Sequence, residues 1–172
     1  MGDVSEKQMA RNREKFQEAS KVFEAVIKEI DFIFQSRRND IKDGKINVIN
    51  EGFVSKKDFL MYVEEEAISR VATAMGKKIP LVKECWKILT LPPPICSELE
   101  SGVLTLVKAQ LAIPLCLDPF DDKAIESAER LVRVMLGEDD LGKIKEAVKE
   151  ESKKVWFSNT AVVDQLMRQS QH

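Results

Sequence analysis

Four carboxylates that lie close together are the residues of this 172-residue chain best suited to chemistry. Asp118, Asp121 and Asp122 precede a helical pattern, and Glu126 follows after about one helical turn. Hard cations such as Ca²⁺ and Mg²⁺ require clustered oxygen ligands, so these four side chains are the predicted metal ligands. Aspartates before a helix also cap its free N–H groups and complement its dipole, which needs no metal. We expect these aspartates to cap the helix, and the alternative is that the four carboxylates bind a divalent cation.

Nucleophilic and acid–base catalysis have little support in the sequence. The one histidine is the terminal His172, so the commonest general base and the usual partner of a nucleophile are missing. Cys85, Cys96 and Cys116 have no CxxC spacing and no histidine to activate them, so we predict that they are structural. Phosphate-loop, dinucleotide-binding and hydrolase motifs do not occur. We predict no catalytic residues. We also predict no cofactor, with Ca²⁺ or Mg²⁺ at the four carboxylates as the alternative. An enzyme that uses carboxylates alone stays open.

The charge balance excludes some classes of partner. There are 27 basic and 29 acidic residues, which give a formal net charge of −2 and no global attraction for nucleic acid. A local basic cluster surrounds Arg37 and Arg38. No signal-peptide pattern and no run of roughly 18 apolar residues occurs, so we expect a cytoplasmic protein without integral membrane association.

Hydrophobic periodicity predicts helices along most of the chain. Caps and stop signals at Ser55, Gly76 and Pro80 mark where they begin and end. An irregular segment is expected near 36–54, where the pattern breaks. The helices are expected over 5–35, 55–75, 80–91, 97–117, 123–137, 139–157 and 161–167, and Asp139 with Asp140 opens the sixth. The predicted fold is an all-α antiparallel bundle of about six or seven helices, with 1–172 as a single domain and 91–96 as an alternative point of division.

Two segments inside this pattern stand out. Residues 103–117 are apolar on nearly all faces, which predicts a central buried helix that Pro114 kinks or ends early. If the chain itself did not cover so apolar a surface, a partner would have to do so. Before it, three consecutive prolines at 92–94 predict a stiff, extended connector.

Part of the second half carries a limited resemblance to a known family. An apolar helix, an acidic loop and an amphipathic helix between Lys108 and Ile144 are similar to one half of the tellurite-resistance TerB-like domains, which are helical modules with acidic interhelical loops. Pro119 departs from this pattern, because that loop usually has glycine after its aspartate. The similarity covers less than a quarter of the chain, and we assign no family on it.

The missing catalytic residues, balanced charge and apolar helix favour binding over catalysis. We therefore expect a non-catalytic protein–protein interaction module, such as an adaptor, a regulatory subunit or an inhibitor-like or immunity-like protein. Trp156 and Phe157, at a helix end, are predicted docking side chains, and Arg37 and Arg38 complete the predicted partner-binding set. Another protein is the expected partner, and a homo-oligomer stays open. The alternatives are a helical regulator that binds a divalent cation through 118–126 and a carrier of hydrophobic ligands.

Overall fold

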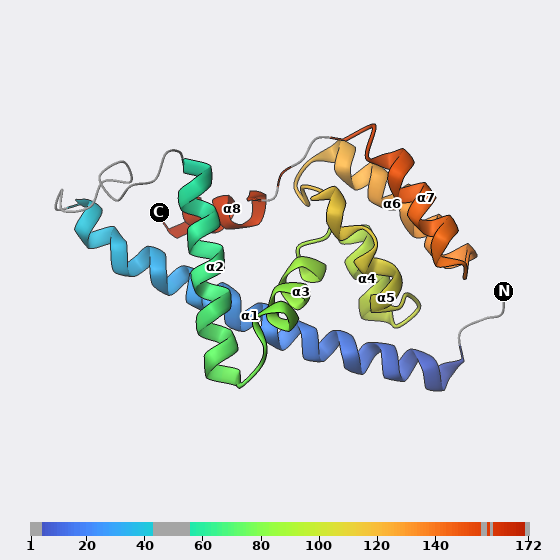
Figure 1. The fold of residues 1–172 in the computed structure, drawn as a ribbon, viewed down its shortest axis with the longest axis horizontal. Helices are drawn as coiled ribbons and strands as arrows, with labels where there is room; N and C mark the ends of the chain where they lie inside the picture. The colour runs from blue at the N-terminus through green and yellow to red at the C-terminus, as the bar shows by residue number, and fades with distance from the viewer. Residues whose placement is uncertain (1–4, 43–55, 156–157, 159, 171–172) are drawn as a thin grey trace. The chain divides into compact units, whose positions relative to one another are not determined.

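The computed structural model describes residues 5–42, 56–155, 158 and 160–170, with the backbone alone over 38–42. Every regular element in this part of the chain is a helix, which confirms the predicted all-α class. No helix within these ranges is long and apolar enough to cross a membrane. The order is α1 (Glu6–Lys42), α2 (Lys56–Met75), α3 (Ile79–Leu89), α4 (Pro93–Ser101), α5 (Leu106–Gln110), a short 3₁₀ helix (Ile113–Leu115), α6 (Asp122–Gly137), α7 (Leu141–Glu151) and α8 (Ala161–Ser170) (Figure 1).

The chain divides into two compact units. The first comprises Met1–Lys21 and Glu84–Asn159, and the second comprises Val22–Lys83 and Thr160–His172. Helices α1 and α3 each contribute residues to both units. The alternative division expected near 91–96 falls inside the first unit, and the expectation of one domain stays a prediction.

In the first unit, α4 packs against α6 and α5, and α6 packs against α7 (Figure 1). Apolar side chains at helical spacing along α6 point into the core of this unit, as the amphipathic pattern predicts. Asp140 starts α7 as predicted, because its Oδ1 accepts the Gly142 N–H at 2.8 Å. The largest fully buried side chains of this unit are Trp86, Ile88, Ile95, Leu99, Leu104, Leu131, Met135 and Ile144.

The apolar stretch 103–117 does not form the single central helix that was predicted. Gly102 ends α4 with a φ of +86°, Thr105 caps the separate helix α5, and Cys116 ends the 3₁₀ helix with a φ of +47°. With this division the described residues form eight α-helices, which is consistent with the expected bundle of about six or seven. The first unit covers most of the stretch itself, so a partner is not needed to cover it; Leu104, Ala109, Ala112, Leu115 and Leu117 are buried.

The three prolines begin a helix instead of forming the extended connector that was predicted. Pro92 alone is polyproline-like, with φ −58° and ψ 154°, and it precedes the first residue of α4. Pro93 and Pro94 form the first turn of the helix, where a backbone N–H has no intrahelical acceptor and its loss costs nothing. The fixed φ of proline therefore starts α4 four residues before the expected cap at Ser97.

The second unit is built from α2, α8 and the part of α1 from Val22 onward. Helices α2 and α8 pack together, and Lys56 Nζ lies 2.8 Å from Asp164 Oδ1. The rings of Phe34 and Phe59 lie 6.2 Å apart between their centroids. The buried apolar side chains are Val22, Val26, Ile30, Ile33, Phe34, Phe59, Leu60, Val63, Ala67, Ile68, Val71, Ala72, Val82 and Val163.

Helix α1 continues past Gln35, where the pattern predicted its end, to Lys42. The expected irregular segment 36–54 is therefore wrong for 36–42, and the rest of it that precedes 55 lies outside the described residues. The apolar stripe ends at Gln35, which is why the pattern predicted the end of the helix there. The polar residues that follow include no proline or glycine that would stop a helix before Asp43. The predicted cap at Ser55 also lies outside the described residues.

The first turns of α1 approach the α4–α5 connection backbone against backbone. A Cβ at position 102 would lie 2.5 Å from the Met9 carbonyl oxygen, so only glycine fits there. Asn12 Nδ2 donates a hydrogen bond of 2.8 Å to the Gly102 carbonyl, and the Asn12 side chain is buried. Arg13 Nη1 lies 3.3 Å from the Ser101 carbonyl, at the exposed edge of the same contact. The bond from Asn12 to Gly102 joins residues that are 90 positions apart in the sequence.

We expect Gly102→Ala to lower the free energy of unfolding by roughly 3 kcal/mol, because a left-handed backbone and a clash with Met9 act together. Gly76→Ala is the matched control, since Gly76 also has a positive φ of +64° but a Cβ there would meet nothing within 4 Å. Its loss should be about 1 kcal/mol. Urea unfolding followed by circular dichroism measures both values. Equal losses would show that the approach to Met9 does not constrain position 102.

Candidate functional site

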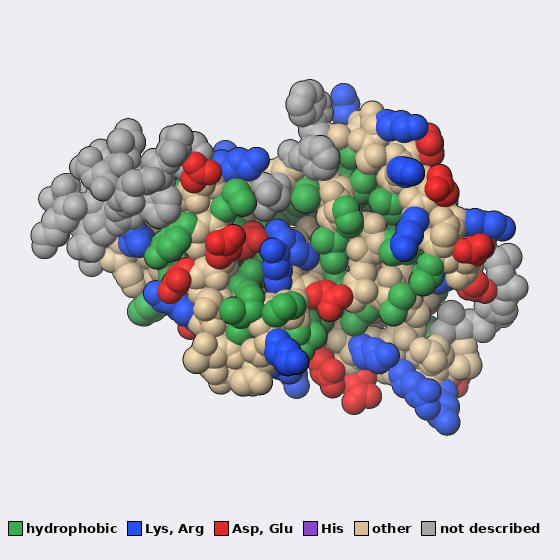
Figure 2. All heavy atoms as spheres, viewed as in Figure 1, with side chains coloured by type: hydrophobic (Ala, Val, Ile, Leu, Met, Phe, Trp, Pro, Cys, Tyr) green, Lys and Arg blue, Asp and Glu red, His purple; other side chains and the backbone are tan. Residues whose placement is uncertain are grey.

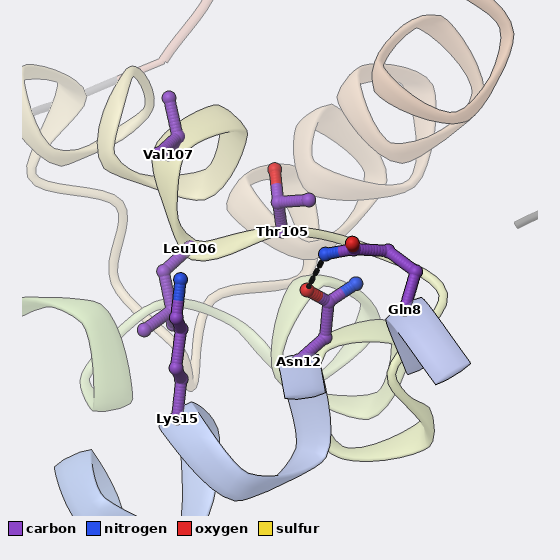
Figure 3. Close-up of a pocket in the computed structure, with 6 residues that line it drawn as sticks. All are labelled: Gln8, Asn12, Lys15, Thr105, Leu106 and Val107. Atoms are coloured by element: carbon purple, nitrogen blue, oxygen red, sulfur yellow. Dashed lines mark hydrogen bonds between the residues drawn. The ribbon is translucent and has the colours of Figure 1, made fainter. Parts of the chain in front are cut away.

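A pocket of about 250 Å³ lies in the first unit between α1 and the start of α5. Gln8, Asn12 and Lys15 come from successive turns of α1, whereas Thr105, Leu106 and Val107 come from the other wall (Figure 3). The buried amide of Asn12 lies between the walls and is held on both sides. Its Oδ1 accepts from Gln8 Nε2 at 2.9 Å, and its Nδ2 donates to the Gly102 carbonyl.

The α1 wall of the pocket is polar and cationic, and the opposite wall is mainly apolar. The Lys15 side chain extends along Leu106, whereas Val107 points away from α1 (Figure 3). Lys15 forms no ion pair within the described chain, and Val107 is 55% exposed. The lining contains no carboxylate, thiol or imidazole. This arrangement can hold an anionic or hydrogen-bonding group beside an apolar one.

The sequence interpretation did not single out this pocket. Asn12 was the available signal, because it precedes Phe16 and Ala19 at the spacing of the apolar stripe of α1. A polar side chain on a buried stripe must find a hydrogen-bond partner. Its partner, the carbonyl of Gly102, could not be found from local patterns.

The carboxylates of the acidic loop have local structural partners. Asp118 Oδ1 accepts the Phe120 N–H at 2.8 Å, and Asp121 Oδ2 caps α6 by accepting the Ala124 N–H at 3.2 Å. Asp122 and Glu126 are exposed on the first turns of α6. Within the described ranges, no three His, Cys, Asp or Glu side chains gather closely enough to hold a metal ion. The cap at Asp121 accounts for one of the four predicted ligands, and cation binding by the loop stays a prediction.

We expect Asp121→Ala to lower the free energy of unfolding by about 1 kcal/mol through loss of the N-cap. Asp122→Ala is the control, because that side chain is exposed and its neighbour already provides the cap. Asp122→Ala should lower the free energy of unfolding by only about a few tenths of a kcal/mol. Thermal unfolding of both variants, with Ca²⁺, with Mg²⁺ and with excess chelator, separates the two roles. A cation-dependent rise in Tm that both substitutions remove would contradict a purely capping role.

Two of the four predicted partner-binding residues, Trp156 and Phe157, lie outside the described residues. The side chain of Arg38 does so as well. Arg37 lies in the second unit, where its guanidinium carbon is 5.8 Å from the Phe59 ring centroid and 5.6 Å from that of Tyr62. It is half-buried and stacks on aromatic rings, so it stabilises the packing of α1 on α2. A role of these four residues in docking stays a prediction.

A buried carboxylate, which the sequence interpretation missed, joins α6 to α7. Glu151 Oε2 accepts from Ser127 Oγ at 2.6 Å and from Arg130 Nη2 at 3.0 Å, and its Oε1 accepts from Arg130 Nε at 2.8 Å. The hydrogen bonds from Arg130, assisted by the one from Ser127, lower the pKa of Glu151 from 4.5 to about 2, although burial acts the other way. The same bonds raise the pKa of Arg130. This pair joins residues 21 positions apart in the sequence.

We expect Glu151→Gln to lower the free energy of unfolding at pH 7 by roughly 2 kcal/mol, because it removes charge-assisted hydrogen bonds. The folded pKa lies below the unfolded value, so the contribution is complete above pH 4.5 and is lost as the pH falls toward 2. The difference in the free energy of unfolding between wild type and variant should therefore decrease as the pH falls from 4.5 toward 2. Glu150→Gln, which removes an exposed pair with Lys153, should leave no such difference at any pH. A difference at Glu151 that does not change with pH would contradict the ionised pair.

Cys96 has a structural role that its surroundings explain. Its Sγ lies 3.2 Å from the Leu91 carbonyl oxygen, with the carbonyls of Ile88 and Leu89 a little farther away. Burial, together with the nearby Glu100 carboxylate, raises the pKa of the thiol to about 11. The thiol is therefore protonated at neutral pH and donates to the end of α3, which agrees with the prediction of a structural cysteine.

The sequence matches no family model, and neither a curated protein nor a solved structure matches it.

Proposed function

We propose that this chain is a non-catalytic helical module that binds another protein. The observation that carries the proposal is the pocket between α1 and α5, which presents hydrogen-bonding groups and an apolar wall but no catalytic side chain. The buried bond from Asn12 to Gly102 fixes both walls before any partner binds, so binding requires little rearrangement.

The size and lining of the pocket favour a segment of a protein over a small molecule. Small-molecule sites commonly enclose roughly 300–1,000 Å³ and are mostly apolar. This pocket is smaller, at about 250 Å³, and half of its lining residues are Gln, Asn and Lys on the α1 wall. A carrier of hydrophobic ligands needs a larger apolar cavity than this pocket. One side chain with its neighbours in a peptide fits this volume.

The chemistry of the lining specifies the partner segment. Lys15 supplies an ammonium group that has no carboxylate partner within the described chain, and Gln8 supplies an amide on the other side of Asn12 (Figure 3). An acidic side chain or a chain-terminal carboxylate satisfies the ammonium group. Leu106 beside Lys15, and the exposed Val107 at the rim, favour an apolar residue next to that carboxylate. We propose a short segment in which an acidic residue adjoins an apolar one.

A random peptide library displayed on phage, selected on the immobilised full chain, tests this function. We expect enriched peptides to share an acidic residue next to an apolar residue. Lys15→Glu should weaken the binding of the corresponding synthetic peptides about tenfold or more, as expected for a lost charge-assisted hydrogen bond. Val107→Asp should weaken it as well, because it places a like charge at the rim. Isothermal titration calorimetry gives the affinities.

Matched controls lie on α7, where Lys145 and Leu141 are similarly exposed. Lys145→Glu and Leu141→Asp repeat the charge changes away from the pocket and should leave binding unchanged. Circular dichroism verifies that all four variants fold. Peptides that bind the Lys15→Glu variant as tightly as wild type, or a library without enrichment, would contradict the proposal.

A further inference from the structure

The connection between α2 and α3 is an exposed and apolar part of the second unit. We call residues 73–83 the α2–α3 turn; it lies at the end of α2 away from α8 (Figure 1). All nine residues over 73–81 are exposed. Three of them are large and apolar: Met75 is 40% exposed, Ile79 52% and Leu81 45%. Isolated exposed apolar residues are ordinary, but three within seven positions on one turn form a patch.

The same turn is positively charged. Lys77 and Lys78 lie between the apolar side chains, and Lys83 follows them. The turn contains no Asp or Glu, so it carries a charge of +3 in a chain whose net charge is −2. Within the described chain, none of these lysines forms an ion pair or a side-chain hydrogen bond, and all three are exposed. On the face shown in Figure 2, by contrast, basic and acidic side chains are intermixed.

The backbone holds the turn in one shape. Gly76 has a φ of +64°, and its N–H donates to the Thr73 carbonyl while that of Lys77 donates to the Ala72 carbonyl. These two bonds form a Schellman motif, which ends α2 rigidly. On the far side, the buried Val82 anchors the start of α3. The apolar side chains are therefore presented to solvent without a cost in loop ordering.

We propose that the α2–α3 turn docks the chain on an anionic lipid bilayer. A convex turn that carries apolar side chains flanked by lysines can place the former in the acyl boundary and the latter among the headgroups. Most of its backbone donors are already satisfied, as burial in a bilayer requires. Pro80 has no N–H, and the N–H groups of Gly76, Lys77, Leu81 and Val82 donate to carbonyls of α2 or of the turn.

Co-sedimentation of the purified full chain with vesicles tests this proposal. The vesicles contain phosphatidylcholine and phosphatidylserine at about 7 to 3, or phosphatidylcholine alone. We expect reversible binding to the anionic vesicles that weakens as salt is raised. Each lysine near such a surface contributes roughly fivefold, so the double variant Lys77→Gln, Lys78→Gln should bind about 25-fold more weakly. Ile79→Ser with Leu81→Ser should lose roughly tenfold.

Controls of equal charge and similar exposure lie on or beside α7. Lys143→Gln with Lys145→Gln repeats the charge change, and Leu136→Ser with Leu141→Ser repeats the apolar one. Both should bind as wild type does. No binding to anionic vesicles would overturn the proposal and leave the turn as a contact for an acidic protein. Equal losses in the controls, or insensitivity to the change at Ile79 and Leu81, would overturn it too. None of these outcomes bears on peptide binding at the pocket of the first unit.

Discussion

The hydrogen bond from Asn12 to the Gly102 carbonyl is the interaction on which the arrangement of the first unit depends. It forms where the α1 backbone comes so close to the α4–α5 connection that a Cβ would collide with Met9. A buried amide without a partner would cost more free energy than its hydrogen bond supplies, so the contact is either made completely or not at all. The two walls of the pocket belong to these two segments. The bond therefore determines whether the pocket exists.

Several polar groups of the first unit stabilise the fold. Asp121 caps α6, Glu151 joins α6 to α7 as a carboxylate with a lowered pKa, and Cys96 is a protonated donor at the end of α3. Lys15 and the lysines of the α2–α3 turn are among the exposed groups of the described chain that have no such partner. These two places have different chemistry, one a small polar pocket and the other a convex apolar and cationic turn. A chain that binds a protein segment with one unit and a lipid surface with the other would act as an adaptor.

Local patterns predicted the all-α class and located α2, α3, α6 and α8 closely, because end signals and apolar stripes coincide there. The predicted end of α7 at 157 is wrong, because the helix ends at Glu151. Local patterns failed over 97–117, where apolar residues on every face carry no period, and the backbone at Gly102 decides where the helices divide. They also missed the pair of Arg130 with Glu151, because spacing along one helix cannot reveal a partner 21 positions away on another helix. The pocket could not be predicted for the same reason: its walls meet only in the folded chain, and Asn12 on the apolar stripe was its one local signal.

The central claim is that this chain works by binding a partner protein and not by catalysis. Native mass spectrometry tests that claim most directly. Cells that produce the chain are mildly cross-linked, and the chain is then gently purified from them and measured. We predict a second protein in fixed stoichiometry, which is lost when the chain carries Lys15→Glu. A bare monomer from those cells, or a complex that Lys15→Glu leaves intact, would contradict the account.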